Sequence, residues 1–234
     1  MTEKLQPQKR KRQIRNAGFE IFQEKGYENT TVRDIIDEIG ISKGGFYHHY
    51  SSKEELLEDI AEGIIEVIVE ILQDIIERED LSGLEKLNRY IREVNSYKIE
   101  KTDELSLLMS EMYYGGKNIR LEKKFLELTR QQVFPLFSRV VKEGIEDGSF
   151  KTDYPQEAAE FYLDILLIYQ RRIGEIFARA IKDRNQDMLE DIRRRASFLQ
   201  NILESALGLK EGELVLTDVI GKTLNDIWRE KWEK

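Results

Sequence analysis

The stretch TTVRDIIDEIGISKGGFYHHYSSKEEL, from Thr30 to Leu56, decides the fold of this 234-residue chain. Its first half carries apolar residues at helical spacing, Val32, Ile35, Ile36 and Ile39. This helix is expected to open at Thr30 or Thr31 and to end at Gly40. A short connection, GIS, then leads to a second helix over Ser42–Tyr50. Helix, tight turn and helix in this order predict a helix-turn-helix motif.

The second helix has two different sides when its residues are placed at about 100° intervals around its axis. Phe46 and Tyr50 fall together and continue the apolar side of the preceding helix. The other side gathers Gly44, Tyr47 and His48, with Lys43 in the first turn and His49 on the flank. We therefore expect one side of this helix to be buried and the other to be exposed.

Both histidines of the chain, His48 and His49, lie next to each other on this helix. Adjacent helical positions diverge, whereas a zinc-binding histidine pair on a helix is spaced four residues apart. The chain has no cysteine and no third histidine, and no serine-centred nucleophile motif accompanies the pair. The histidines therefore indicate neither a metal site nor a catalytic dyad, and no cofactor is expected.

Two glycines, Gly44 and Gly45, weaken a helix that is already short, because each glycine costs about 1 kcal/mol relative to alanine. One interpretation is a loose turn that tolerates glycine. The other is that bare backbone at this point can approach a phosphate or a base edge closely. Hydrogen-bond donors cluster around the glycines, on Ser42, Lys43, Tyr47 and both histidines. This clustering favours the second interpretation.

Charge is distributed unevenly along the chain. The net charge is −8, yet residues 1–53 hold 10 basic and 7 acidic side chains, whereas residues 54–234 hold 27 and 38. A basic head on an acidic body is expected when one end of a protein meets phosphate. The lack of cysteine suits a reducing, cytoplasmic environment. We expect neither a signal peptide nor a membrane span, since no apolar run approaches ~18 residues.

Apolar residues recur at steps of three and four through most of the chain, which predicts helices and no strands. The fold class is therefore predicted to be all-α. The expected helices cover about residues 8–25, a long segment from Ser52, and residues 84–99, 103–114, 119–146, 155–182 and 187–207, followed by an amphipathic tail. A capping box is expected over Ser52–Glu55, and Pro135 is expected to kink the helix over 119–146.

The stretch that decides the fold resembles the DNA-binding head of TetR-type (tetracycline-repressor-like) transcriptional regulators. The matching positions are Phe22, Gly26-Tyr27, Thr30-Thr31, Ile35 to Ser42, Gly44, Tyr47, His49-Tyr50 and Lys53. The chain departs from the family pattern at Ile36 and Ile39, where alanine is usual, and at Tyr50, where phenylalanine is usual. The resemblance implies an N-terminal helix-turn-helix domain over residues 1–53. A long helix would join it to a helical effector-binding and dimerisation domain over residues 54–234.

The resemblance also implies which residues contact double-stranded operator DNA. The expected contacts are Thr31, Arg33, Ser42, Lys43, Gly44, Gly45, Tyr47, His48, His49 and Lys53. Lys43, Gly44, Tyr47 and His48 would enter the major groove, and Gly45 and His49 would touch the flanking backbone. Thr31 and Arg33 would lie at the phosphate end of the first helix of the motif. Lys53 would bind a further phosphate at a helix N-terminus.

The body beyond residue 60 carries no further motif, so its expected sites rest on apolar patterning and on the resemblance. A homodimer interface is expected at Phe161, Ile165, Ile168, Leu189, Ile192, Ala196, Leu199 and Leu203. The alternative is that these apolar faces pack within one subunit. An effector pocket is expected at Met109, Met112, Tyr113, Phe134, Phe137, Tyr162 and Tyr169, each of which singly could be ordinary core.

These features predict a ligand-responsive, DNA-binding transcriptional regulator, with repression favoured over activation. A small apolar or aromatic effector would release it from its operator. Two other classes stay open. A helical adaptor would bind protein partners without sequence-specific DNA binding. An enzyme with a carboxylate-based metal site would need Glu-x-x-His ligand pairs, and no histidine exists outside the head.

Overall fold

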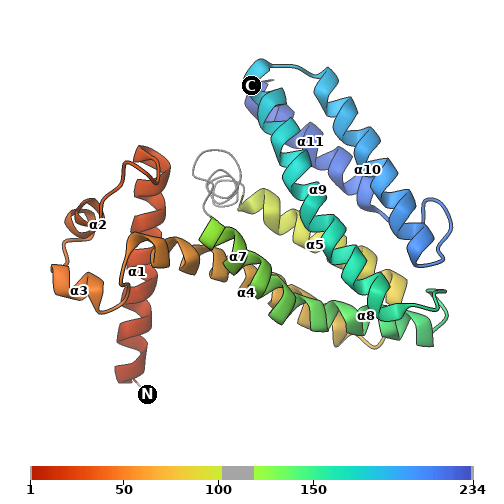
Figure 1. Ribbon diagram of the computed structural model, residues 1–234, viewed down its shortest axis with the longest axis horizontal. Helices are drawn as coiled ribbons and strands as arrows, with labels where there is room; N and C mark the ends of the chain where they lie inside the picture. The colour runs from red at the N-terminus through yellow and green to blue at the C-terminus, as the bar shows by residue number, and fades with distance from the viewer. Residues whose placement is uncertain (1, 102–118, 233–234) are drawn as a thin grey trace. The chain divides into compact units, whose positions relative to one another are not determined.

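The structure is a computed structural model that describes residues 2–101 and 119–232 (Figure 1). Its helices are α1 (Thr2–Lys25), α2 (Val32–Ile39), α3 (Lys43–Tyr47), α4 (Lys53–Ile76), α5 (Gly83–Glu100), α7 (Ile119–Leu128), η2 (Thr129–Val133), α8 (Phe134–Glu146), α9 (Pro155–Asp183), α10 (Asp187–Ala206) and α11 (Leu216–Trp232). No strand occurs in the described residues, and the all-α prediction is confirmed. None of the described helices is long and apolar enough to cross a membrane. The helix predicted over 103–114 lies outside the described residues.

The chain divides into two compact units, and the boundary between them falls inside α4. The first unit comprises residues 1–66 and 101–129, and the second comprises residues 67–100 and 130–234. The first turns of α4 contribute Leu56, Leu57 and Ile60 to buried core, which explains why the first unit extends past Lys53. The functional division at residues 53 and 54 stays a prediction.

The core of the first unit forms from α1, α2, α3 and α4. Each of these helices contributes at least one apolar side chain with no more than 1% exposure: Ile14, Phe22, Ile35, Phe46 and Leu56. A glycine sets the approach of α4 to α1, because a Cβ on Gly18 would lie 2.4 Å from the Leu56 Cδ2. The helix-turn-helix is therefore held on a tightly packed support.

Side-chain caps fix the ends of the predicted helix-turn-helix. Thr31 caps α2, since its Oγ1 accepts from the Asp34 N–H at 3.2 Å while Asp34 accepts from the Thr31 N–H at 2.8 Å. Gly40 ends α2 with a φ of 67°, a left-handed conformation that favours glycine. Ser42 caps α3 by accepting from the Gly45 N–H at 3.0 Å. The predicted starts of both helices are confirmed.

The predicted start of α1 and the predicted capping box of α4 differ from the structure. Helix α1 begins at Thr2, earlier than the predicted start near Gln8. At α4, Ser52 Oγ accepts from the Glu55 N–H at 3.2 Å, as a capping box requires. The Glu55 carboxylate, however, accepts from Ser51, from its N–H at 2.7 Å and its hydroxyl at 2.6 Å. The capping interaction is thus shared by two serines, because the carboxylate reaches one residue further back.

The helix predicted over 119–146 is interrupted ahead of its proline. Helix α7 passes into a π-helical segment, η2, and α8 then carries Pro135 in its first turn. Proline has no N–H, so the carbonyl four residues earlier has no partner in a regular α-helix. A π-helical turn is one of the usual ways in which a helix adapts to such a disruption. The structure thus interrupts this helix from Thr129 onward, and a kink at Pro135 itself stays a prediction.

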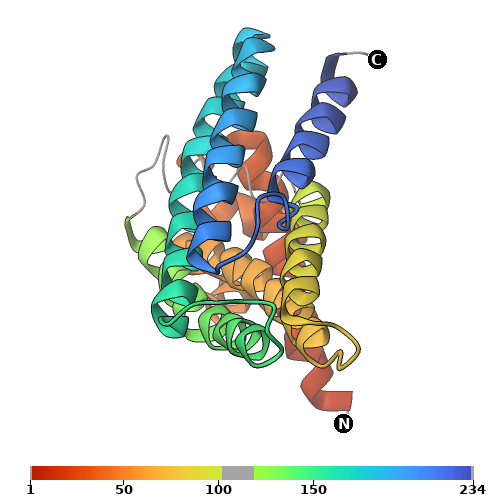
Figure 2. The same ribbon diagram turned by 90° about the vertical axis from the view of Figure 1, so that its right-hand side faces the viewer.

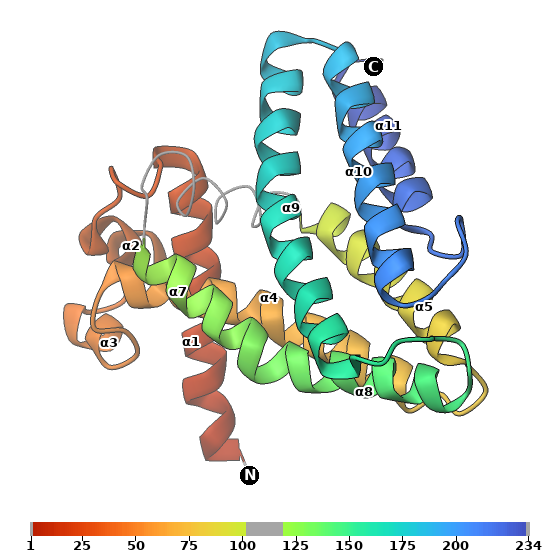
Figure 3. The same ribbon diagram turned by 45° about the vertical axis from the view of Figure 1, so that its right-hand side comes forward.

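The second unit consists of α5, α8, α9, α10, α11 and the end of α4. Helices α9 and α10 run antiparallel as a connected pair, and α11 packs against α10 and α5 (Figures 2 and 3). An aromatic group lies at the core where α5, α8 and α9 pack. Phe137 and Tyr162 stack with ring centroids 4.5 Å apart, and Tyr90 lies 6.0 Å from Phe137. All three side chains are buried.

Close backbone packing joins α5 to the end of α8. A Cβ on Gly83 would lie 2.2 Å from the Gly144 Cα, and a Cβ on Gly144 would lie 2.2 Å from the Phe150 ring. Lys86, 5% exposed, donates to the Glu143 carboxylate at 2.6 Å and to the Ile76 carbonyl at 3.0 Å. A buried ammonium needs such partners because it has lost its water. These contacts hold α5, α8 and the end of α4 together.

A buried carboxylate stabilises the connection between α10 and α11 through hydrogen bonds to its backbone. Glu204 is 2% exposed, and its Oε1 accepts from the backbone N–H groups of Gly212 at 3.0 Å and Leu214 at 2.9 Å. The same oxygen accepts from Gln200 Nε2 at 3.0 Å. These bonds satisfy loop amides that would otherwise be buried without partners. The predicted amphipathic tail is α11.

Candidate nucleic-acid interface

The exposed side of α3 is the first part of the candidate interface. Tyr47 is 46% exposed, whereas Phe46 is fully buried and Tyr50 is 1% exposed. Lys43 and His48 are exposed on the same side as Tyr47. The two predicted sides of this helix are therefore confirmed by burial. Packing holds one side of α3 in the core and leaves the other side free to contact a partner.

Gly44 is not required by packing within the subunit. It lies inside α3 in a helical conformation, and a Cβ there would meet only Ser42 Oγ, at 3.9 Å. A Cβ on Gly45 would be tighter, at 3.3 Å from the same atom. Since an alanine would fit at position 44 and would favour the helix, the glycine there has no explanation inside the subunit. This observation supports the interpretation that something outside approaches the backbone.

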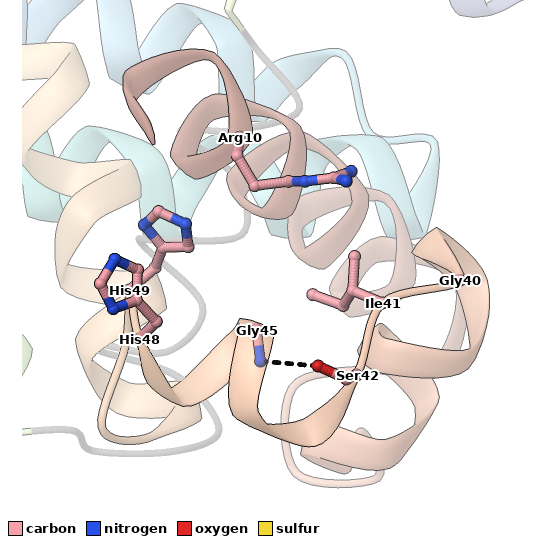
Figure 4. Close-up of a pocket in the computed structure, with 7 residues that line it drawn as sticks. All are labelled: Arg10, Gly40, Ile41, Ser42, Gly45, His48 and His49. Atoms are coloured by element: carbon pink, nitrogen blue, oxygen red, sulfur yellow. Dashed lines mark hydrogen bonds between the residues drawn. The ribbon is translucent and has the colours of Figure 1, made fainter. Parts of the chain in front are cut away.

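A groove runs between α1 and α3 beside these glycines (Figure 4). It encloses about 360 Å³ and is lined by Arg10, Gly40, Ile41, Ser42, Gly45, His48 and His49. Figure 4 shows the Arg10 side chain entering from α1 near Ile41 and the two histidine rings near the other end, with the Ser42–Gly45 hydrogen bond along one wall. Arg10 was not among the predicted contacts, although it belongs to the basic cluster at the start of the chain. The groove therefore adds a cation to the predicted interface.

The two histidines are in contact and differ in exposure. Their ring centroids are 5.0 Å apart in an edge-on arrangement, with His48 exposed and His49 half-buried. Burial lowers the pKa of His49, and the nearby charges of His48, Lys11 and Arg10 lower this pKa further. The lowered pKa favours the neutral imidazole of His49, which offers one donor and one acceptor. No cluster of three or more metal-ligating side chains occurs in the described residues.

The two predicted DNA contacts at the start of α2, Thr31 and Arg33, differ in how strongly their side chains already interact within the subunit. The Thr31 hydroxyl donates to the Asp34 carboxylate at 2.6 Å. Lys25, 2.8 Å from that carboxylate, and Thr31 hold the pKa of Asp34 well below its usual value. Arg33 has a side chain that is 88% exposed and lies 3.5 Å from Asp37. Arg33 is therefore well placed to reach a phosphate, whereas Thr31 is committed to capping α2.

Lys53 is directed into its own subunit. Its Nζ donates to three backbone carbonyls of the connection between α1 and α2, those of Tyr27 at 2.8 Å, Thr30 at 3.2 Å and Glu28 at 3.4 Å. The ammonium also lies 4.3 Å from the centre of the Tyr27 ring. An ammonium has three N–H donors, and three acceptors already surround it. This geometry gives Lys53 a structural role that differs from the predicted phosphate contact.

The helix-turn-helix that presents this surface is shared with known proteins. A family model described as "Bacterial regulatory proteins, tetR family" matches residues 14–60, which include the whole helix-turn-helix. This match assigns residues 14–60 to the tetR family. Curated relatives of the chain include the HTH-type transcriptional regulator YfiR of Bacillus subtilis, 27% identical over 158 residues (67% of this chain and 76% of the relative). The HTH-type transcriptional repressor KstR2 of Mycolicibacterium smegmatis is 27% identical over 165 residues (70% and 75%).

Solved TetR-family structures share the fold. PfmR from Thermus thermophilus superposes with a TM-score of 0.52 at 25% identity, covering 68% of this chain and 84% of that chain. A regulator from Pectobacterium atrosepticum, ECA1819, has a TM-score of 0.63 at 19% identity, covering 87% and 96%. The matched family is one of transcriptional regulators, and the helix-turn-helix within residues 14–60 is a DNA-binding motif.

The predicted effector residues are only partly brought together. Met109, Met112 and Tyr113 lie outside the described residues. Phe137 and Tyr162 stack in the core of the second unit, whereas Phe134 and Tyr169 are half-buried. The sequence did not single out Tyr90, which completes the aromatic group. Burial raises the pKa of Tyr162 well above its ordinary value, and its hydroxyl has no hydrogen-bond partner in the described part of the chain.

The predicted dimer interface requires a correction. Five of its residues, all on α10, are at most 1% exposed within a single subunit: Leu189, Ile192, Ala196, Leu199 and Leu203. Contacts with α9 and α11 cover this side of α10, so these side chains cannot face a second copy. On α9, Phe161 is 41% and Ile168 is 64% exposed, and Ile165 is half-buried. Phe198, 59% exposed on α10, is a further exposed aromatic that the sequence did not single out.

Proposed function

We propose that this TetR-family protein is a ligand-responsive transcriptional repressor that acts in the cytoplasm and binds operator DNA as a homodimer. One observation carries the DNA-binding part. A large aromatic side chain, Tyr47, is 46% exposed on α3 directly next to the buried Phe46. Lys43 lies on the same side, with its Nζ 5.9 Å from the centre of the Tyr47 ring. An exposed aromatic and a cation on a short helix that is anchored from behind suit insertion into a major groove.

The proposed contacts fall into two groups. Lys43, Gly44, Tyr47 and His48 are proposed to face base edges, because they occupy the exposed side of α3. Phosphate contacts are proposed for the side chains around this face, Arg33, Ser42 and His49, with the backbone of Gly45. Base contacts give specificity, whereas phosphate contacts fix position and make binding depend on salt.

A second copy of the chain is proposed to pack on the exposed side of α9 and α10. Phe161, Ile168 and Phe198 are large apolar side chains that this side leaves between 41% and 64% exposed. Covering such side chains with a second copy would remove apolar surface from water. Two heads held in this way could read half-sites in successive major grooves, about 34–36 Å apart. A single head would contact too few bases for specific binding.

The effector is proposed to be a small apolar or aromatic molecule that binds in the second unit. The buried aromatic side chains Tyr90, Phe137 and Tyr162 support this chemical class. The hydroxyl of Tyr162 could satisfy a polar group of the effector. A coupling of about 1–3 kcal/mol between effector and operator would change DNA affinity roughly 5- to 150-fold. Helix α4 contains residues of both units and is proposed to carry this coupling.

The test is selection of bound sequences from random DNA, followed by affinity measurement on the selected duplex. Tyr47→Ala and Lys43→Ala should each weaken binding by about 1–3 kcal/mol if their side chains read bases. Tyr154→Ala is a matched control, since Tyr154 is a 67% exposed tyrosine of the second unit. Failure to enrich any sequence, or an equal effect of all three substitutions, would refute the proposal.

A further inference from the structure

A polar cluster lies in the first unit, around the hydroxyl of Tyr50. Asp59 of α4 accepts a hydrogen bond from the Tyr50 hydroxyl at 2.8 Å through its Oδ2. Its Oδ1 accepts from the Lys11 ammonium of α1 at 2.5 Å. Arg15, one turn further along α1, has its Nη1 3.6 Å from the Asp59 Oδ2. One carboxylate therefore contacts two cations and one phenol.

Asp59 is nearly buried, which makes these contacts mutually dependent. The residue is 9% exposed, and its side chain is 11% exposed. A carboxylate with so little water is stable in its charged form only when hydrogen bonds and opposite charges replace the water. Both carboxylate oxygens are engaged. Loss of any one partner would leave the buried charge undercompensated, so the cluster holds its elements together as a unit.

The cluster joins three elements of the first unit, and the Tyr50 hydroxyl also lies 3.3 Å from the Lys11 carbonyl. Lys11 and Arg15 come from α1, Asp59 comes from α4, and Tyr50 follows directly after the two histidines that end the α3 segment. The Tyr50 ring packs 5.8 Å from Phe46, the residue that anchors α3 in the core. The position of α3 is thus tied to α4 through Tyr50, and α1 is tied to the same carboxylate through Lys11.

Two sequence features show that the cluster is accommodated by its surroundings. Gly63, one turn beyond Asp59 on α4, leaves room for Arg15, because a Cβ there would lie 3.0 Å from the Arg15 Nη1. Tyr50 occupies a position at which the TetR-type pattern has phenylalanine. The phenylalanine ring would pack on Phe46 equally well but could not donate to Asp59. The hydroxyl therefore adds a directed bond to a position that is otherwise only apolar.

We propose that Asp59 is a positioning residue for DNA recognition. It touches no DNA itself, and it acts through Tyr50 and Lys11 to fix the angle of α3 and of the basic start of α1 with respect to α4. This inference rests on the proposed function of α3 in operator binding. Arg10, the residue before Lys11, lines the groove beside α3, so the same cluster sets where that cation lies. Because α4 continues into the second unit, the Tyr50–Asp59 bond is also one contact through which a shift of α4 would reach α3.

The test uses the full chain and two DNA probes. One probe is a duplex that the wild-type protein selects from random DNA, and the other is a random-sequence duplex of the same length. Affinities for both are measured for wild type, Tyr50→Phe, Asp59→Asn and the double variant. Glu62→Gln is the matched control, because it removes one negative charge from α4 and Glu62 makes none of the cluster contacts described above.

A positioning role predicts that the two probes respond differently. For Asp59→Asn, affinity for the selected duplex should fall about tenfold relative to the random duplex, the change that corresponds to ~1.4 kcal/mol. Affinity for the random duplex should stay constant or rise, since a negative charge near the basic head is lost. Tyr50→Phe should lower the same ratio without changing the charge. The double variant should lose less than the sum of the two single variants, because both substitutions act on the same Tyr50–Asp59 contact.

Each alternative gives a different result. A merely structural role would lower binding of both probes in proportion to the loss of folded protein, and the ratio would not move. A purely electrostatic role would make Asp59→Asn equal to Glu62→Gln and would leave Tyr50→Phe like wild type. Either outcome would overturn the inference while leaving the proposed function intact. If the wild type itself preferred no selected duplex over random DNA, the proposed function would fail instead.

Discussion

Replacement of Lys53 by methionine separates two roles for a residue that sequence alone assigns to DNA. Methionine keeps an unbranched apolar side chain but removes the three N–H donors and the charge. In the structure these donors hold the carbonyls of Tyr27, Glu28 and Thr30. We therefore expect Lys53→Met to loosen the connection between α1 and α2 and to leave the salt dependence of DNA binding nearly unchanged.

The expected magnitude follows from the contacts. A hydrogen bond from a charged donor contributes about 1.5–3 kcal/mol to stability. Bonds that share one ammonium are not additive, and Lys53 is only half-buried, so a total loss of about 2 kcal/mol is reasonable. At 1.4 kcal/mol per factor of ten, local opening of this connection should become about 30-fold more frequent. The amide of Thr30, which donates to the Tyr27 carbonyl at 3.2 Å, reports on that opening.

Hydrogen exchange of peptides that cover residues 26–36 measures the expected loss of protection. Fluorescence of Trp228 and Trp232, both on α11, follows the second unit and should be unchanged. Arg33→Met is the matched control, since that side chain is 88% exposed. It should reduce the slope of log K against log salt by about 0.9 and leave exchange unaltered. If Lys53→Met instead lowered the slope by this amount and kept full protection, the structural assignment would be refuted.

Four other substitutions or conditions give direct tests. Gly44→Ala should stabilise the protein by up to ~1 kcal/mol yet weaken binding to the selected duplex, as measured by thermal unfolding and titration. Gly144→Ala should destabilise the second unit by about 1–3 kcal/mol, seen by tryptophan fluorescence, because its Cβ would overlap the Phe150 ring. Phe198→Ser should shift the protein from dimer to monomer in sedimentation experiments at micromolar concentration. The lowered pKa of Asp34 means that its stabilising contribution is present above its unfolded pKa of about 3.9 and is lost as the pH falls below it, which acid titration of hydrogen exchange in α2 would detect.

The helix-turn-helix could be predicted from sequence because its determinants are local. Thr31 and Ser42 cap helices whose first turns lie within three residues of them, and Gly40 adopts the conformation that ends α2. Such interactions depend on neighbours in the chain and on little else. The same holds for the two sides of α3, since a helix wheel fixes which residues share a face.

The element that covers the apolar side of α10 could not be predicted in this way. The spacing of Leu189, Ile192 and Ala196 predicts a buried seam on α10, and the seam is buried. The spacing does not say whether a second copy or another helix of the same chain covers it. Here α11, which follows α10 after a short connection, packs against α10 from within the subunit. The hydrogen-bond acceptors of Lys53 could not be predicted for a similar reason. A long flexible side chain can reach acceptors that lie more than twenty residues away in sequence.

The glycines of the two units show how structure can separate packing requirements from requirements set by a partner. Gly18, Gly83 and Gly144 each have a neighbouring atom within 2.4 Å of the place where a Cβ would lie, so a side chain there would force atoms of the subunit itself to move. Gly44 has no such neighbour and no unusual backbone angle, and glycine is the poorer choice for the helix that contains it. A residue that costs stability without serving its own subunit is best explained by a molecule outside it. The exposed Tyr47 and Lys43 on the same helix indicate the face that this molecule would contact, and the match of residues 14–60 to the tetR family indicates that the molecule is DNA.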